Sequence, residues 1–233
     1  MAGKSIRWLG HATFIINTPG GKTIVTDPWI EGNPSCPITL GDIKQAHLVL
    51  VSHDHFDHSV NAVDIAKATG AIVAAMPETV GRFQQELELP QEQVVNGMGM
   101  NIGGSVVVDG ITITMVEAFH SSATGAPAGW IMRMEDGAHI YHAGDTGIFQ
   151  NMKLLGELYP LDLALLPVGS CFTMDWVQAA RATALLSPKK VIPMHYKTFP
   201  ILEQTADRFA ELAKKEAPET KVVVLEAGSE YTW

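Results

Sequence analysis

The sequence is poor in several features, and each shortage argues against a class of protein. Cys36 and Cys171 are its only cysteines, too few for a disulfide framework, which favours a reducing, cytoplasmic setting. No apolar run approaches the ~20 residues that span a bilayer. Residues 1–21 also lack the apolar segment and cleavage site of a signal peptide. Lys and Arg together number 16 against 25 Asp and Glu, a net charge of −9, which argues against a large nucleic-acid footprint, since that needs a basic face. We therefore expect a cytoplasmic protein that binds neither membrane nor nucleic acid.

Histidine, in contrast, is concentrated in one place. The chain has nine histidines, and three of them lie in the stretch SHDHFDHS (52–59), directly after the apolar run HLVLV. Two residues apart on extended chain, His53 and His55 point to the same side, and Asp57 and His58 follow where the loop turns into the next helix. One ion cannot comfortably take all four groups, so the spacing predicts two adjacent metal ions. The alternative is a solvated polar loop after a strand.

The order of expected strands and helices favours one compact domain over residues 1–233. Strands are expected at 6–18, 22–30, 46–52, 71–76, 106–116 (a hairpin turning at Asp109–Gly110), 130–135, 138–145, 161–169, 189–196 and 222–228. Helices are expected at 59–70, 79–89, 173–186 (capped by Thr173) and 205–217. Two mixed β-sheets packed together, with helices on their outer faces, accommodate this order.

Three later residues complete the candidate metal site. His120, Asp145 and His195 each lie just after an apolar strand, where loops carry polar groups to one edge of the sheets. Asp145 is the only new acid among them, and its two oxygens can bridge two cations. One ion is then assigned to His53, His55 and His120, the other to Asp57, His58 and His195, and Asp145 spans both.

These elements resemble a known family. HxHxDH (53–58), a lone histidine at His120, GDT (144–146) and a lone histidine at His195 form, in this order, a pattern similar to that of the metallo-β-lactamase superfamily. WLGHATFII near the start, TDPW (26–29), GDTG and residues 165–174 are similar to a lactonase-like branch, which includes ascorbate-6-phosphate lactonase relatives and uncharacterised metal-dependent hydrolases.

The resemblance implies an α/β fold, a four-layer αββα sandwich with a dinuclear site at one edge. A hydroxide bridging the two ions would be the nucleophile, and Asp57 would accept or orient its proton. Zinc is the expected metal, although manganese, nickel and iron also suit imidazole and carboxylate ligands. Homo-oligomers are common in this branch, so a homo-oligomer is expected.

We therefore expect a hydrolase that cleaves an ester-like bond, in a lactone or phosphoester, of a small molecule. A nuclease or phosphodiesterase of the same superfamily is one alternative, although such members generally carry a clamp domain or basic arm. A non-hydrolytic diiron protein is another, although related diiron proteins carry a flavin domain and replace some histidines by acids.

For several residues near the motifs, the sequence leaves alternative roles open. His11, in GHAT, is an extra ligand, a substrate-facing catalytic acid or base, or a packed histidine. Asp27 accepts a hydrogen bond from a ligand imidazole or forms a turn before Pro28. Lys197 receives an anionic substrate group or is simply solvated. Cys171 is expected to be a buried thiol, and His142 is expected to be structural.

Overall fold

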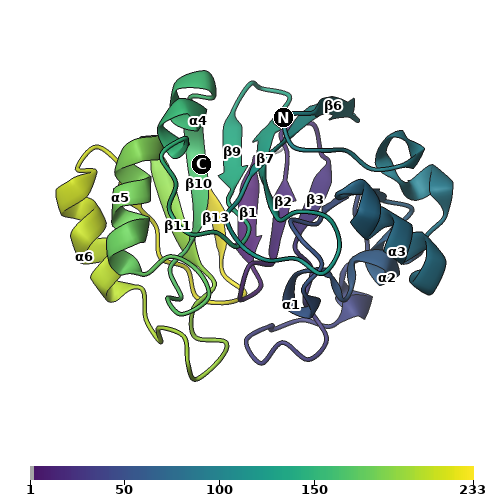
Figure 1. Cartoon of the computed structure of the whole chain (residues 1–233), viewed down its shortest axis with the longest axis horizontal. Helices are drawn as coiled ribbons and strands as arrows, with labels where there is room; N and C mark the ends of the chain where they lie inside the picture. Colours follow the sequence, from purple (N-terminus) through teal and green to yellow (C-terminus); the bar gives the residue numbers. More distant parts are fainter. Residues whose placement is uncertain (1–2) are drawn as a thin grey trace.

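Two mixed β-sheets form the centre of the molecule in the computed structural model, which describes residues 3–233 (Figure 1). The first sheet has six strands in the spatial order β13-β1-β2-β3-β4-β5. They are β1 (Ser5–Trp8), β2 (Phe14–Asn17), β3 (Thr23–Thr26), β4 (Leu48–Leu50), β5 (Ile72–Ala74) and β13 (Glu230–Thr232). Pairing is antiparallel from β13 to β3 and parallel from β3 to β5.

The second sheet has seven strands in the order β12-β11-β10-β9-β8-β7-β6. They are β6 (Ser105–Val108), β7 (Ile111–Glu117), β8 (Ala128–Arg133), β9 (His139–His142), β10 (Leu161–Pro167), β11 (Lys190–Met194) and β12 (Lys221–Val222). Strands β6 to β9 pair antiparallel and β9 to β12 pair parallel. The expected hairpin turn at Asp109–Gly110 is present, with positive φ at both residues.

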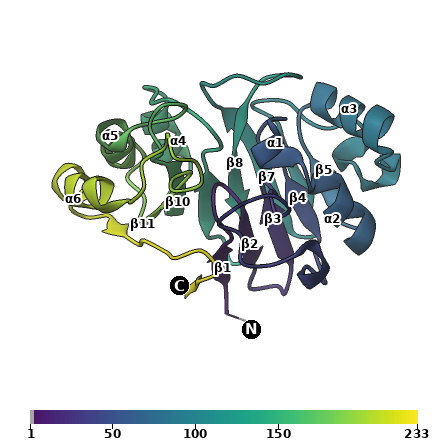
Figure 2. The ribbon, with the colours of Figure 1, turned by 90° about the horizontal axis from the view of Figure 1, so that it is seen from below.

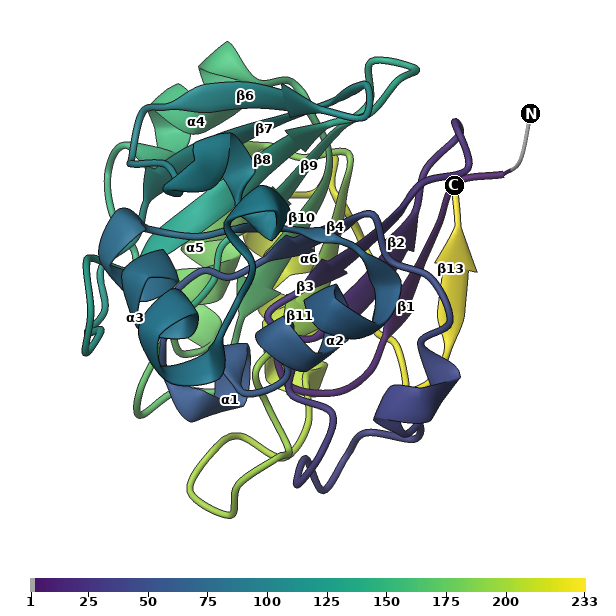
Figure 3. The same ribbon diagram turned by 90° about the vertical axis from the view of Figure 1, so that its right-hand side faces the viewer.

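Helices cover the outer face of each sheet, which confirms the four-layer αββα prediction. The first sheet is covered by α2 (Ala62–Thr69) and α3 (Pro77–Leu87), and the second by α4 (Met152–Leu158), α5 (Trp176–Leu186) and α6 (Asp207–Glu216) (Figures 1 and 2). Figure 3 views the molecule from the side of α2 and α3. The remaining helical turns are α1 (Phe56–Ser59), η1 (Leu40–Asp42), η2 (Gln91–Gln93) and η3 (Val95–Gly97). None of the helices within residues 3–233 is long and apolar enough to cross a membrane.

Strand β4 shows why the layers form. Leu48 and Leu50 point into the core between the two sheets, whereas Val49 and Val51 point the other way, into the cluster that also holds Val63 of α2. Successive side chains of a strand face opposite sides, and both faces of this strand are covered. A continuous apolar run is the pattern that such a strand requires.

The strand expected at residues 6–18 is instead two strands, β1 and β2, joined by a tight turn. Gly10 and His11 have positive φ, 94° and 54°, and Leu9 N–H donates to the Thr13 carbonyl at 2.9 Å. A Cβ on Gly10 would lie 2.8 Å from Ser35 Cβ, so the turn needs glycine. His11 therefore lies in a turn at the sheet edge and not within a strand.

Two other expectations are corrected in the C-terminal half, and one further helix is present there. The strand expected at 222–228 pairs only over Lys221–Val222, after which the chain crosses to the first sheet and pairs as β13 with β1. Helix α5 begins at Trp176, and Asp175, not Thr173, caps it by accepting a hydrogen bond from Gln178 N–H at 2.7 Å. Helix α4 was not expected from the sequence.

Candidate metal centre

The candidate ligands come together at one edge of the two sheets. His11 follows β1, Asp27 follows β3, the 53–58 cluster follows β4, and His120, Asp145 and His195 follow β7, β9 and β11. Strands β1, β3 and β4 run in one direction, as do β7, β9 and β11, so their carboxyl ends share an edge. This is the lower edge in Figure 1. The structure thus brings together all seven residues predicted as metal ligands.

The donor atoms form two main groups, and a third group of His53, His58 and Asp145 overlaps both. His53, His55 and His120 each place a ring nitrogen within 4.8 Å of the others, and His53 Nε2 lies 2.9 Å from His55 Nδ1. Asp57, His58 and His195 form the second group at the same spacing. The fourth member of this group is His11, which the sequence left with several roles.

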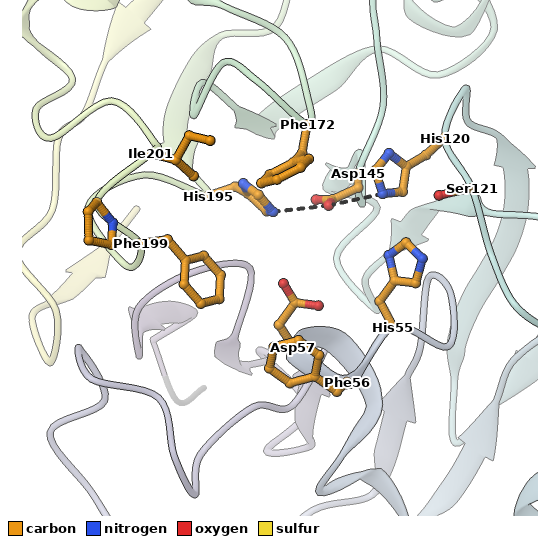
Figure 4. A pocket seen from close by; sticks show the side chains of 11 residues that line it. His55, Phe56, Asp57, His120, Ser121, Asp145, Phe172, His195, Phe199 and Ile201 are labelled. Carbon is orange, nitrogen blue, oxygen red and sulfur yellow. Dashed lines mark ion pairs between the residues drawn. The ribbon is translucent and has the colours of Figure 1, made fainter.

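Asp145 lies between the two groups. Its Oδ2 is 3.0 Å from His195 Nε2, 3.4 Å from His58 Nε2 and 3.5 Å from His120 Nε2. Figure 4 shows the carboxylate between the rings of His120 and His195. Burial alone would raise the pKa of this carboxyl, but the charges of His195 and His58 lower it well below its usual value. One carboxylate thus faces imidazoles of both groups.

Several buried polar atoms of this cluster have no hydrogen-bond partner, which tests whether a cation fits. His58 Nε2, Asp145 Oδ1 and His195 Nδ1 are all in this condition. Buried polar atoms are rarely left unpaired in proteins. Burial lowers the pKa of His58, but the carboxylates of Asp145 and Asp27 outweigh it and raise that pKa well above its usual value. The cluster therefore calls for positive charge at its centre, and its imidazole and carboxylate donors suit a divalent transition metal.

Asp27 orients His58. The buried Asp27 Oδ2 accepts from His58 Nδ1 at 2.8 Å and from Ser52 Oγ at 2.7 Å, while Oδ1 accepts from Ser52 N–H at 2.7 Å. With its proton on Nδ1, His58 leaves Nε2 free to face Asp145. Burial would raise the pKa of the Asp27 carboxyl, and the neighbouring His58 lowers it. Asp27 thus accepts a hydrogen bond from the imidazole of a candidate metal ligand, which is the first of the two roles that the sequence leaves open for it.

His11 lies behind the candidate ligands and does not line the pocket that opens over them, which is described below. Its ring is fully buried, with Nδ1 at 2.6 Å from Thr198 Oγ1 and Nε2 at 3.1 Å from Asp57 Oδ2. Its ring centroid is 3.9 Å from that of His195. Burial, helped by the charge of His195, lowers the pKa of His11 to about 4, so the ring is neutral near pH 7. A substrate-facing role does not fit this position, whereas contact with Asp57 or metal ligation does.

Asp54 is the residue that sequence reasoning missed. Its carboxylate accepts hydrogen bonds from Ser122 Oγ at 2.9 Å, from Ala123 N–H at 2.7 Å and from Thr124 Oγ1, and Arg82 Nε lies 3.6 Å away. It therefore ties the 53–58 segment to the loop that carries His120. Strand-like alternation was the available signal, because Asp54 must point away from the side that His53 and His55 share.

Three other residues that the sequence singled out, Lys197, Cys171 and His142, lie outside the ligand groups. Lys197 does not line the pocket: it is exposed, and its Nζ lies 3.7 Å from Glu226. The expectation of a buried Cys171 is wrong, since this residue is exposed on the turn that follows β10. His142 is fully buried, with Nε2 at 2.9 Å from the Ala12 carbonyl and Nδ1 accepting from Gly144 N–H, a structural role as predicted.

A pocket of about 780 Å³ opens over the candidate ligands (Figure 4). His55, Asp57, His120, Asp145 and His195 lie on one side of it. Ser121 lies beside His120, and the other walls are apolar and consist of Phe56, Phe172, Phe199, Pro200 and Ile201. A substrate in this pocket would contact both the polar cluster and the apolar walls.

Comparison with known proteins gives the family. A family model described as the β-lactamase superfamily domain matches residues 5–195. The chain belongs to the metallo-β-lactamase superfamily. Two curated relatives, both called UPF0173 metal-dependent hydrolase, are similar to this superfamily member along most of its chain. The protein of Nitratidesulfovibrio vulgaris (strain DP4) is 48% identical over 227 residues, which are 97% of this chain and 94% of the relative. That of Pyrobaculum islandicum is 47% identical over 210 residues, with coverage of 88% and 89%.

A solved structure supports the same family. Igni18, a metallo hydrolase from the hyperthermophilic archaeon Ignicoccus hospitalis KIN4/I, has a TM-score of 0.89 and 37% identity to this superfamily member, covering 100% of this chain and 99% of its own. The predicted resemblance and fold are thus confirmed. This superfamily member is a metal-dependent hydrolase.

Proposed function

We propose that this superfamily member holds two divalent ions and hydrolyses an ester-like bond, in a lactone or a phosphoester, of a small molecule. The observation that carries the proposal is the position of Asp145 Oδ2, 3.0 to 3.5 Å from imidazole nitrogens of both ligand groups. A single carboxylate placed between two ligand sets can bridge a pair of adjacent cations, as two-metal hydrolytic sites hold them. Zinc is the first metal to test, followed by manganese, nickel and iron.

In this proposal the ligands divide between two ions. His53, His55 and His120 would hold one ion, Asp57, His58 and His195 the other, and Asp145 both. Bound ions would supply hydroxide at neutral pH, by lowering the pKa of water from ~15.7 toward ~7, and would polarise the bond under attack.

Asp57 is placed to orient the attacking water. Its side chain reaches the pocket and accepts a hydrogen bond from His11 Nε2 at 3.1 Å. Burial would raise the pKa of this carboxyl, but the bond from His11 lowers it well below its usual value. A carboxylate this acidic is a poor store for a proton, so it acts by accepting a hydrogen bond.

His11 and Thr198 keep Asp57 in that state. Because Nε2 of the neutral His11 ring carries the proton that it donates to Asp57, its Nδ1 accepts from the Thr198 hydroxyl at 2.6 Å. The chain Thr198–His11–Asp57 thus fixes the direction of the Asp57 carboxylate from behind the site.

The test is metal analysis followed by a substrate panel. Purified protein should contain about two equivalents of metal, lose turnover on chelation and regain it when metal is restored. Lactones, phosphodiesters, thioesters and single-stranded RNA are assayed with each metal. One equivalent of metal, rapid RNA cleavage or oxygen-dependent turnover by a diiron centre would each contradict the proposal.

A further inference from the structure

Resting on the proposed function, we propose that the substrate is an uncharged carboxylic ester or lactone with an apolar chain or ring. The apolar part lies against Phe56, Phe172, Phe199 and Ile201, and the ester carbonyl lies over the ligand cluster. This narrows the proposed function to neutral, hydrophobic substrates and sets phosphorylated compounds aside.

The apolar walls come from three separate loops that meet at the ligand cluster. Phe56 begins α1, directly after the first ligand pair, Phe172 lies in the turn after β10, and Phe199 and Ile201 lie in the loop after β11 (Figure 4). Phe56, Phe172 and Ile201 are 60%, 55% and 62% exposed. Large apolar side chains exposed together at a cleft mark a binding surface, because a protein without such a ligand gains nothing from leaving them in water.

The aromatic walls rest on a buried support. Trp29, only 3% exposed, stacks on Phe199 with ring centroids 5.5 Å apart and an interplanar angle of 20°. It meets Phe56 edge to face at 5.5 Å. The rings of Phe199 and Phe56 are therefore both held on one buried indole, and an apolar ligand would bind without first ordering them.

Phe172 is presented by a strained turn. Ser170 and Cys171 both have positive φ, 63° and 48°, although neither is glycine. The turn is closed by Ser170 N–H donating to the Met174 carbonyl at 3.0 Å, and Met174 N–H donates to the Thr146 carbonyl at 3.1 Å, next to Asp145. Such conformations cost free energy and persist where the surrounding structure imposes them, often at ligand sites.

The charges of the pocket do not favour a substrate with an anionic group away from the bond that is cleaved. None of its eleven lining residues, all within the described part of the chain, is lysine or arginine, and the two charged ones are Asp57 and Asp145. Lys197, the cation that the sequence offered, lies outside the pocket near Glu226. A phosphate carried away from the reacting bond would thus be placed against phenylalanine without a counter-charge.

A series of δ-lactones with the metal-loaded enzyme tests the proposal. From δ-valerolactone to δ-octalactone, kcat/KM should rise about two- to four-fold per added methylene, where four-fold corresponds to about 0.8 kcal/mol of transfer free energy. δ-Gluconolactone and 6-phospho-δ-gluconolactone should be poorer substrates than δ-octalactone, the phosphorylated one most of all. Equal kcat/KM along the alkyl series, or preference for the phosphorylated lactone, would overturn the proposal.

Variants locate the effect on the wall. Phe172→Ala should lower kcat/KM about 10-fold for δ-octalactone and much less for δ-valerolactone. Leu158→Ala is the matched control, because Leu158 is 60% exposed, close to the 55% of Phe172, but lies on α4 away from the pocket. If Phe172→Ala affects both lactones equally, or Leu158→Ala has the same effect, the wall does not select the chain.

Binding separates failure of this proposal from failure of the proposed function. Octanamide, which resists hydrolysis, should bind the metal-loaded wild type at least about 10-fold more tightly than propanamide in isothermal titration calorimetry, and Phe172→Ala should remove most of that difference. Such binding without turnover of any ester or lactone would support the apolar pocket and refute the ester-cleaving function. Equal affinities for the two amides would refute the apolar pocket whatever bond is cleaved.

Discussion

Replacing Asp54 by alanine should weaken the metal group of His53, His55 and His120 without removing any of its ligands. The carboxylate accepts three hydrogen bonds from residues 122–124, the loop that carries His120. Hydrogen bonds to charged groups contribute ~1.5–3 kcal/mol each, so even at the low end the three bonds stabilise this loop by about 4.5 kcal/mol. Part of that order persists through other contacts, such as Ser122 Oγ to the Thr124 carbonyl at 2.8 Å.

The expected loss of metal affinity is about 10- to 100-fold, the range found when groups that orient metal ligands are removed. The more conservative Asp54→Asn keeps an acceptor oxygen but not the charge, so its loss should be about 10-fold. Competition with a calibrated chelator measures each affinity, and thermal melts of the metal-free proteins show whether the variants remain folded.

Glu219→Ala is the control, because Glu219 is an exposed acid outside the candidate site. Metal binding by Asp54→Ala as tight as that by Glu219→Ala would show that Asp54 does not support this ligand group. An equal loss at both metal positions would also contradict this expectation, because the loop that Asp54 holds by hydrogen bonds carries His120, a ligand of only one group.

Three further outcomes are expected. His55→Ala or Asp145→Ala should reduce kcat by more than about 1,000-fold while far-UV circular dichroism stays close to wild type, and unchanged activity in either would remove the site as described. Asp27→Asn should lower metal affinity about 10- to 100-fold, because the amide no longer fixes the His58 tautomer; chelator competition measures this, and wild-type affinity would contradict it. The raised pKa of His58 means that metal-free protein carries a proton there near pH 7, which the metal must displace. Apparent affinity should therefore rise with pH, by up to about 10-fold per unit, and calorimetry in buffers of different ionisation enthalpy should detect proton release; no release near neutral pH would contradict the reasoning.

The positions of the candidate ligands could be predicted because each follows a recognisable apolar strand. Loops after such strands converge at one sheet edge, and the alternation of side chains places His53 and His55 on one side. The same reasoning could not place Lys197, since its direction depends on a backbone with a φ of 71°. A positive φ at a non-glycine residue leaves no mark in the hydrophobic pattern.

The errors in the fold have a similar origin. Residues 6–18 read as one apolar strand, and only the left-handed Gly10 and His11 divide it. This break places His11 behind Asp57, where its Nε2 donates a hydrogen bond to the carboxylate. The pairing of β13 with β1 was also invisible, because long-range strand pairing is decided by which edge remains open rather than by local sequence.

The pairing of Ser5–Arg7 with Glu230–Thr232 has a consequence for biosynthesis. While the ribosome is still making the intervening residues, the outer edge of β1 has open peptide groups and no neighbour. Such an edge can recruit a strand from another nascent polypeptide. Slowing translation ahead of residue 230 should therefore increase the demand for chaperones, because β13 is the strand that closes this edge.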